Sequence, residues 1–522
     1  MASHFAPAID VLDSAIRHSV HFREWLCARR WCGDAIGARA EVSVKERAVL
    51  AESGSEAIVL FLAVAKLPEG QVVVHLPLSL ATARPHPDAF ELQAGSERLF
   101  VSEAERGEPY AKFLVDGFHG QAKLPTSSGD GLYFSGGDLG SLQGGAPVLV
   151  GDSSNLVVRF ATSKDEVVFK SYKIPDVRNR EPEILERLHK RQFRHVPRFL
   201  GELALGRGPD RLVLGLATER VEGPDLFTWF TAGWRAELGG GEPLATDVDR
   251  ERLDVAGALG DATAALHEAL LEGHAGPFQA ETFTADDATA ARRAAITNLG
   301  DSLRRLAALA QGPDRRLADL ARMARTFLFE NRPRIEAVLQ GLNANVRTAK
   351  SVTHGDLHLG QVLRRAADGS LYFIDFEGEP ERAPGQRAVK WPPLRDVGTM
   401  SRSFSYVKHY AWRDFIRGDA TAALQVLERE KLEGTEGAVA QRLVNWETAA
   451  MEGFSQRYLR STSLYPGLAA EDALKAIRGW MMEKALYEFR YELKHRPVNI
   501  FIPLEGIVAL ATGGGPMRAV SA

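Results

Sequence analysis

Apolar positions divide the chain into a strand-rich first part and a helical second part. Residues 9–28 carry apolar side chains at helical spacing, which predicts a helix near the start. Five β-branched or aromatic runs, separated by Gly, Pro and Ser clusters, then predict a mostly antiparallel sheet. The runs cover residues 56–66, 71–80, 89–93, 97–102 and 110–118. A first domain that ends near residue 120 accounts for this pattern.

A second strand-rich segment follows a stretch that is dense in Gly and Ser. Residues 125–145 have the composition of a loop or linker. After this stretch, the pattern predicts two strands, a helix and two further strands. They cover residues 148–160, 166–174, 180–192, 199–205 and 211–221. This order of elements is that of a kinase-like small lobe.

The chain becomes mainly helical after Glu222. Apolar residues at helical spacing predict an amphipathic helix within residues 249–272 and a helical pair over residues 284–342, broken at residues 312–314. Three or more helices are expected between residue 395 and Leu493. The patterns together predict an α+β fold with a strand-rich and a helical lobe.

Composition excludes several classes of protein. A chain of 522 residues exceeds one ordinary core, and its 45% hydrophobic and 25% charged residues are typical of soluble globular proteins. A net charge of −4 gives no electrostatic reason to expect nucleic acid or an anionic membrane as a partner. The N-terminus lacks a signal-peptide pattern, and the longest apolar run, residues 57–65, is too short to span a membrane. We therefore expect a cytoplasmic protein, with Cys27 and Cys32 as reduced thiols.

Residues 353–379 contain the candidate chemistry. Phosphoryl transfer needs a carboxylate that orients and deprotonates a hydroxyl, and oxygen ligands for Mg²⁺ on the nucleotide phosphates. Asp356 lies in a His-Gly-Asp turn and is the candidate catalytic base. Gln361 offers an amide oxygen, and Asp375 ends a short apolar strand, so both are candidate magnesium ligands.

Two features near this stretch have alternative interpretations. Glu377 is a candidate for a second metal or for substrate, or it forms an ion pair with Arg387, Lys390 or Arg395. His354 and His358 have the HxxxH spacing of a zinc site, but a Gly and an Asp stand between them on a turn and no third ligand is evident. We interpret these two histidines as residues that brace the loop.

The strand-rich second segment supplies candidate nucleotide contacts. Lys170 ends a strand and is placed to neutralise phosphates, with Glu183 on the following helix as its expected ion-pair partner. Lys173 competes for the lysine role. A GxGxxG loop is missing, and Ser153 and Ser154 in GDSSN occupy its place, either as phosphate contacts or as an ordinary hairpin turn.

These motifs resemble those of bacterial maltokinases, which are relatives of the aminoglycoside phosphotransferases within the kinase-like fold. The resemblance covers most of the chain, and the central motif is specific. The similar segments are RRWCGDAIG, SNLVVRF, VVFKSY, REPEILERL, LGDATAALHEAL, HGDLHLGQVL, FIDFEGEPERAPGQRAVKWPPLRDVGTMSRSFSY, EKALYEFRYELKHRP and FIPL.

The resemblance implies an N-terminal cap subdomain (residues 1–124), a nucleotide-binding small lobe (125–221) and a helical lobe with the acceptor site (222–522). It also implies ATP-dependent phosphorylation of maltose to maltose 1-phosphate, with magnesium, in α-glucan (glycogen) synthesis from trehalose, and a functional link to trehalose synthase. Two alternatives stay open. One is a kinase for glucosamine or another small acceptor, for which Glu447 or Glu488 could contact the amine. The other is an inactive, sugar-binding regulator.

Overall fold

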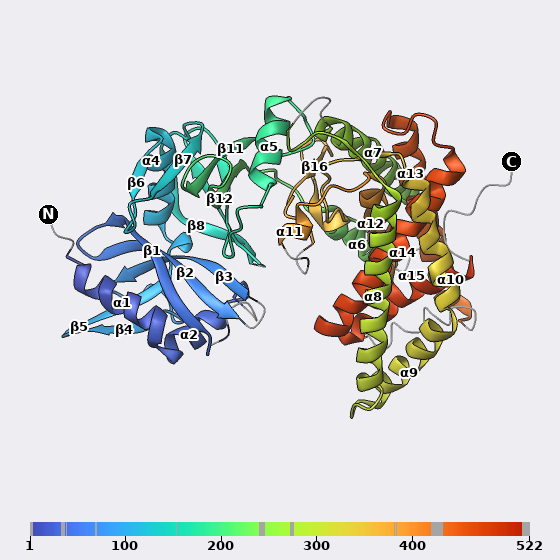
Figure 1. The fold of residues 1–522 in the computed structure, drawn as a ribbon, viewed down its shortest axis with the longest axis horizontal. Helices are drawn as coiled ribbons and strands as arrows, with labels where there is room; N and C mark the ends of the chain where they lie inside the picture. The colour runs from blue at the N-terminus through green and yellow to red at the C-terminus, as the bar shows by residue number, and fades with distance from the viewer. Residues whose placement is uncertain are drawn as a thin grey trace. The chain divides into compact units, whose positions relative to one another are not determined.

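The computed structural model divides into two compact units. It describes residues 4–32, 37, 39–67, 70–152, 154–239, 246–271, 276–379, 382, 384–418 and 432–513. The first unit consists of residues 1–192, 197–221 and 383–385, and the second of residues 193–196, 222–382 and 386–522. In Figure 1 the strands of the first unit run from blue to green, and the helices of the second from green to red.

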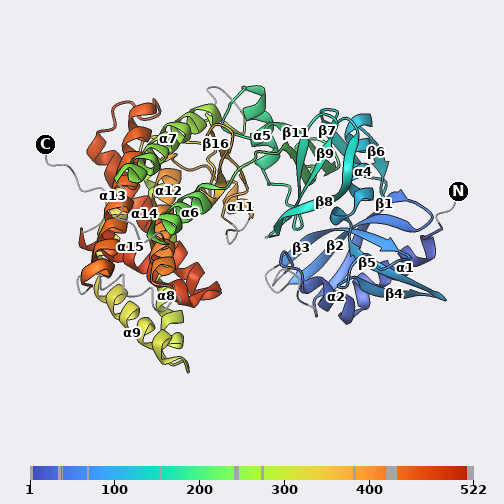
Figure 2. The ribbon, with the colours of Figure 1, turned by 180° about the vertical axis from the view of Figure 1, so that it is seen from behind.

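The first unit begins with two helices and a five-stranded antiparallel sheet of order β1-β2-β3-β5-β4. These elements are α1 (Ala6–His18), α2 (Val20–Cys27), β1 (Glu41–Glu52), β2 (Glu56–Leu67), β3 (Gly70–Ala81), β4 (Phe90–Ala94) and β5 (Glu97–Glu103). Val59 and Phe61 of β2 pack in a core with residues of α1 and α2, whereas Ile58 and Leu60 belong to a second core. Figure 2 shows α1 and α2 beside this sheet. Successive strand residues face opposite sides, and both sides of β2 are covered by a core. The sequence of β2 is therefore a continuous apolar run.

A seven-stranded sheet, of order β6-β7-β11-β12-β10-β9-β8, shares that second core. Its strands are β6 (Lys123–Pro125), β7 (Gly131–Gly136), β8 (Leu142–Asp152), β9 (Leu156–Thr162), β10 (Glu166–Ser171), β11 (Phe199–Leu205) and β12 (Leu212–Glu219). Helix α5 (Glu181–Lys190) lies between β10 and β11 in the chain, and α4 (Glu108–Gly120) supplies Leu114 and Phe118 to the core. The small-lobe order of elements is therefore present.

Three predictions about local structure are wrong. Residues 110–118 lie in α4 and not in a strand. The predicted N-terminal helix is divided at Ser19, whose side chain accepts a hydrogen bond from the Phe22 backbone and caps α2. Residues 125–145, predicted as a linker, form β7 and parts of β6 and β8, because a Gly-rich segment can also pair in a sheet when its few apolar residues, such as Leu132, reach the core.

The second unit is mainly helical. Its longer helices are α6 (Leu226–Gly239), α7 (Thr246–Leu270), α8 (Ala285–Leu309), α9 (Arg315–Glu330), α10 (Arg332–Leu339), α12 (Leu394–Phe415), α13 (Gly434–Ser461), α14 (Ala470–His495) and α15 (Phe501–Thr512). Its short strands are β13 (Glu281–Thr282), β14 (Ala349–Lys350), β15 (Val362–Arg364) and β16 (Leu371–Phe373). The short helix α11 (Pro384–Arg387) has residues in both units. The break at residues 312–314 lies between α8 and α9, as predicted.

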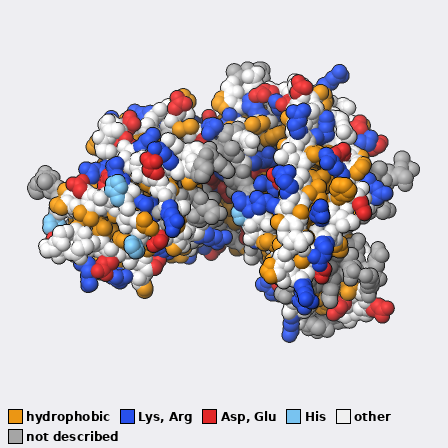
Figure 3. Space-filling view, turned by 60° about the horizontal axis from the view of Figure 1, so that its bottom comes forward, with side chains coloured by type: hydrophobic (Ala, Val, Ile, Leu, Met, Phe, Trp, Pro, Cys, Tyr) orange, Lys and Arg blue, Asp and Glu red, His pale blue; other side chains and the backbone are white. Residues whose placement is uncertain are grey.

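Helices α12 and α14 are buried along most of their length, including charged residues such as Arg395, Arg402 and Lys484. Buried charges of this kind require partners. On the face drawn in Figure 3, acidic and basic side chains are interspersed. Among the described residues, no helix combines the length and apolar character that a membrane span needs.

Candidate active site

The backbone of the loop that carries Asp356 is hydrogen-bonded to a buried carboxylate. Asp396 Oδ2 accepts a hydrogen bond from the His354 backbone N–H at 2.8 Å, and Oδ1 accepts one from Gly355 at 3.2 Å. His267 Nε2 lies 3.2 Å from Asp396 Oδ2. Burial disfavours the charge on Asp396, but the hydrogen bond with His267 holds the pKa of this carboxyl below its usual value. The loop is thus fixed through its backbone, which leaves the Asp356 side chain for chemistry.

Asp356 contacts a buried lysine from a helix far along the chain. Lys484 Nζ on α14 lies 3.0 Å from Asp356 Oδ1 and 2.7 Å from Glu379 Oε1. Glu379 Oε2 accepts a hydrogen bond from Arg395 at 2.7 Å and another from Arg382. The candidate base therefore belongs to a network of alternating buried charges.

The network controls the charge states of its members. Burial disfavours the Lys484 ammonium, but Asp356 and Glu379 outweigh it and raise the pKa of Lys484 above its usual value. Burial also disfavours the Glu379 carboxylate, but Lys484, Arg395 and Arg382 hold the pKa of Glu379 well below its usual range. Both groups are consequently charged at neutral pH.

The two candidate magnesium ligands lie in hydrogen-bond contact. Gln361 Nε2 donates to Asp375 Oδ2 at 2.8 Å, and the backbone N–H of Ile374 donates to the Gln361 carbonyl at 3.0 Å. Asp375 has a φ of 66°, in the left-handed region that non-glycine residues seldom adopt. A backbone held in this conformation at the end of β16 is typical of a functional position.

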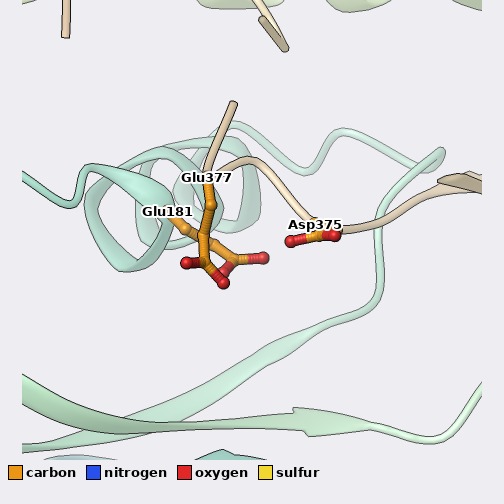
Figure 4. Close-up of side chains that lie close together, drawn as sticks. All are labelled: Glu181, Asp375 and Glu377. Atoms are coloured by element: carbon orange, nitrogen blue, oxygen red, sulfur yellow. The ribbon is translucent and has the colours of Figure 1, made fainter. Parts of the chain in front are cut away.

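The loop after β16 carries a second carboxylate. Figure 4 shows Asp375 and Glu377 on this loop, together with Glu181, which comes from α5. Carboxylate oxygens of Asp375 and Glu377 lie within 4.8 Å of each other. One hard cation could therefore take an oxygen from each residue. This geometry is compatible with the metal interpretation of Glu377.

The two loops of the second unit also pack closely. Gly355 and Gly378 both have positive φ, and a Cβ added to Gly355 would lie 3.4 Å from the Gly378 Cα. His354 Nε2 lies 2.9 Å from the Ile374 carbonyl oxygen. His358 Nδ1 accepts a hydrogen bond from the Gly360 backbone at 3.1 Å. Both histidines brace the loops, as we interpret them from the sequence.

In the first unit, Lys170 has a carboxylate partner, but the predicted partner is wrong. Lys170 Nζ lies 2.7 Å from Oε2 of Glu181, the first residue of α5. Glu183 lies two residues later, a rotation of about 200° on a helix, and therefore faces another direction. The sequence therefore predicted the helix that carries the partner of Lys170, but not the residue.

The other predicted nucleotide contacts have different outcomes. Lys173 is buried and pairs with Glu105, so it does not compete with Lys170 for the same role. Ser154 is exposed in the turn between β8 and β9. Ser153 lies outside the described residues.

Sequence reasoning missed Lys484, Glu379, Asp396 and Glu181. Lys484, Glu379 and Asp396 are charged residues in otherwise apolar or motif-bearing segments, and this pattern could have indicated that they are buried at the site. Their partners cannot be assigned from sequence, because Lys484 and Asp356 are separated by 128 positions.

The fold and the two loops define a kinase-like phosphotransferase. The profile of the phosphotransferase enzyme family (APH) matches residues 146–431, which is more than half of the 522 residues. The chain therefore belongs to the phosphotransferase enzyme family. This confirms the predicted kinase-like class and its relation to the aminoglycoside phosphotransferases, whereas maltokinase stays a prediction.

Relatives of known function lie in the same class. A glucosamine kinase of Streptacidiphilus jiangxiensis is 29% identical over 317 residues, which cover 60% of this chain and 62% of that protein, less than two thirds of its length. A glucosamine kinase of Mycolicibacterium smegmatis (strain ATCC 700084 / mc(2)155) is 28% identical over 372 residues, or 70% of this chain and 77% of that protein.

Solved structures confirm the fold. A glucosamine kinase in complex with glucosamine, ADP and inorganic phosphate superposes with a TM-score of 0.60 at 19% identity, and the match covers 93% of this chain and 98% of that one. At this identity the likeness supports the architecture only.

Proposed function

We propose that the protein is an ATP-dependent sugar kinase and that an amino sugar of the glucosamine type is its first candidate acceptor. The observation that carries the proposal is the pairing of Asp356 with Lys484 beside the Gln361–Asp375 pair, on loops of a phosphotransferase-family chain. The glucosamine kinases among its relatives support the acceptor class.

Asp356 acts as the base in this proposal. Lys484 occupies Oδ1, whereas Oδ2 lies 4.0 Å from His358 Nε2, which is beyond hydrogen-bond distance. Oδ2 is therefore the oxygen that would accept the proton of the acceptor hydroxyl. Lys484 keeps the carboxylate oriented, and Asp396 keeps the loop backbone in place.

Asp375, Gln361 and Glu377 are the residues that would hold magnesium. Their carboxylate and amide oxygens are the hard ligands that Mg²⁺ prefers, and the Gln361 amide nitrogen is directed to Asp375, which leaves the amide oxygen as the ligand atom. Bound magnesium supplies charge neutralisation on the nucleotide phosphates. Lys170, fixed by Glu181, would neutralise the phosphates from the small lobe.

The two carboxylates proposed from sequence to recognise an amine are already paired. Glu447 contacts Lys408 Nζ at 2.6 Å, and Glu488 contacts Arg402 at 3.2 Å. An incoming ammonium would have to compete with these buried cations. The amine contact is therefore better sought elsewhere among the residues that the acceptor meets.

Maltose is the second candidate acceptor, because the segments around Asp356 and Glu488 resemble maltokinases. That alternative would carry the predicted link to trehalose synthase. A coupled ADP-release assay over glucosamine, maltose, glucose and aminoglycosides, followed by phosphorus NMR of the product, tests both candidates. We expect ADP release with glucosamine. Release with none of the acceptors would contradict the proposal and favour the sugar-binding regulator.

A further inference from the structure

The side chains of residues 170–173 contact two buried carboxylates in alternation, those of Glu181 and Glu105. Lys170 Nζ and the Tyr172 hydroxyl each lie 2.7 Å from Glu181 Oε2. The Ser171 hydroxyl donates to Glu105 Oε1 at 2.8 Å, and the Lys173 ammonium contacts the same oxygen. Because successive side chains of an extended chain face opposite sides, each carboxylate holds one face of the segment.

The Tyr172 hydroxyl is buried beside the atom that orients Lys170. It donates to the same Glu181 oxygen that accepts from the lysine. The Lys170 ammonium also lies 5.4 Å from the centroid of the Tyr172 ring. A donor on a rigid, buried ring restricts the positions that this carboxylate oxygen can take. The phenol thus restricts where the lysine ammonium can lie.

The backbone at Tyr172 is itself anchored. Its N–H donates to the Leu214 carbonyl at 3.0 Å. His75 of β3 donates from its backbone N–H to the Lys173 carbonyl at 2.9 Å, and His75 Nδ1 lies 3.1 Å from the Tyr172 carbonyl oxygen. Glu105, in the short helix η1 (Ala104–Arg106), is fully buried on the opposite face. Because its backbone is anchored, Tyr172 can hold the Glu181 carboxylate in a fixed position.

We propose that Tyr172 is a positioning residue for Lys170, and that it acts by fixing Glu181 Oε2 through its hydroxyl. The importance of Tyr172 for phosphoryl transfer rests on the proposed function, in which Lys170 binds nucleotide phosphates. Its effect on Lys170 itself does not depend on any ligand.

Tyr172→Phe removes the hydroxyl and keeps the ring, and the chain offers a matched control. Tyr110 is equally buried, its ring packs 6.2 Å from that of Phe169, and its hydroxyl has no hydrogen-bond partner among the described residues. Tyr110→Phe therefore deletes one buried phenolic oxygen without touching Glu181. Ser171→Ala is a second control, since it deletes a hydroxyl next to Lys170 on the Glu105 face.

The first measurement is the rate at which an acetylating reagent modifies Lys170, followed by peptide mass spectrometry on the folded, ligand-free chain. We expect Tyr172→Phe to raise this rate, because a Glu181 carboxylate that lacks the Tyr172 donor holds the Lys170 ammonium less firmly in place. Tyr110→Phe and Ser171→Ala should match the wild type. Near-UV circular dichroism and thermal melting verify that every variant is folded. Equal labelling of Lys170 in Tyr172→Phe and the wild type would overturn the proposal.

The second measurement separates this proposal from the proposed function. Titration calorimetry with ADP and magnesium should show roughly tenfold weaker binding by Tyr172→Phe and unchanged binding by the two controls. If the wild type itself binds no ADP, the kinase proposal fails, and the labelling comparison still decides the role of Tyr172. If the labelling rate changes while ADP affinity and the KM for ATP do not, Tyr172 does not position Lys170 for nucleotide.

Discussion

The ammonium of Lys484 lies 3.0 Å from Oδ1 of Asp356, although 128 positions separate the two residues. Both side chains are largely buried, with 7% and 15% of their surface exposed. Lys484 also bridges to Glu379, whose other oxygen contacts Arg395. Helix α14 thus reaches the candidate catalytic loop through a buried cation, and removal of its charge takes this contact from Asp356 Oδ1 and Glu379 Oε1.

Lys484→Met should therefore destabilise the second unit strongly. Breaking a buried ion pair by removing one partner costs about 3–5 kcal/mol. Lys475→Met on the same helix is the matched control, because Lys475 pairs with Glu471 and Asp472 at the surface and should unfold like the wild type. Urea unfolding followed by circular dichroism measures both. Equal unfolding midpoints for the two variants would refute the assigned role of Lys484.

Asp356→Asn should remove phosphoryl transfer while nucleotide binding persists. The amide keeps an oxygen for Lys484 but cannot accept the proton of the acceptor hydroxyl, so turnover should fall about 10²–10⁴-fold. The ADP-release assay measures turnover, and calorimetry with ADP measures binding. A variant that keeps most of the wild-type rate would exclude Asp356 as the base.

Asp375→Asn should weaken nucleotide binding only when magnesium is present. The substitution removes the charge that would meet the metal but preserves a hydrogen-bond partner for Gln361. ADP titrations of variant and wild type are compared with magnesium and again with EDTA. The affinities should differ in magnesium and converge in EDTA, and an equal difference in both conditions would indicate a purely structural effect.

Glu181→Gln and Glu183→Gln form a matched pair on helix α5. Glu181 contacts both Lys170 and Tyr172, so its neutralisation should weaken nucleotide binding roughly tenfold. Glu183 is the partner that the sequence predicts, and its substitution should leave binding unchanged. ADP calorimetry decides between them, and the opposite order of effects would restore Glu183 as the functional carboxylate.

Local patterns predicted the backbone around the candidate site, whereas the roles of the site residues stay predictions. The strand before Asp375 forms as predicted, and the chain bends at Gly355 and Asp356, where Gly355 has a φ of 85°. Residues 110–118 were predicted as a strand because their apolar positions fit both the period of a strand and the period of a helix. Lys112 and Asp116 hold the deciding information, since they form a 2.8 Å ion pair at i,i+4 on the exposed side of α4.

Contacts between distant segments were beyond sequence reasoning. Lys484 could be recognised as a charge in a mostly buried helix, but only the packing of α14 against α12 and the catalytic loop places it on Asp356. Glu181 and Glu183 are separated by about 200° around the helix axis, and the direction in which α5 leaves β10 decides which one reaches Lys170. A single sequence contains neither relationship.

The charge network should make stability depend on pH through Glu379. Burial disfavours this carboxylate, but Lys484, Arg395 and Arg382 hold its pKa well below the usual 4.5. A carboxyl whose pKa is lower in the folded chain contributes stability above the unfolded value and loses it as pH falls through the folded value. Glu379→Gln should therefore be much less stable than the wild type at pH 7.

That difference should shrink as pH falls below about 4.5, because protonation of Glu379 in the unfolded wild-type chain then removes its advantage. Urea unfolding at pH 7, 5 and 4 provides the comparison, with Glu471→Gln at the exposed start of α14 as the control that should follow the wild type throughout. A gap between Glu379→Gln and the wild type that stayed constant from pH 7 to pH 4 would mean that the Glu379 charge contributes nothing, and that only its shape and hydrogen bonds hold Arg395 and Lys484 in place.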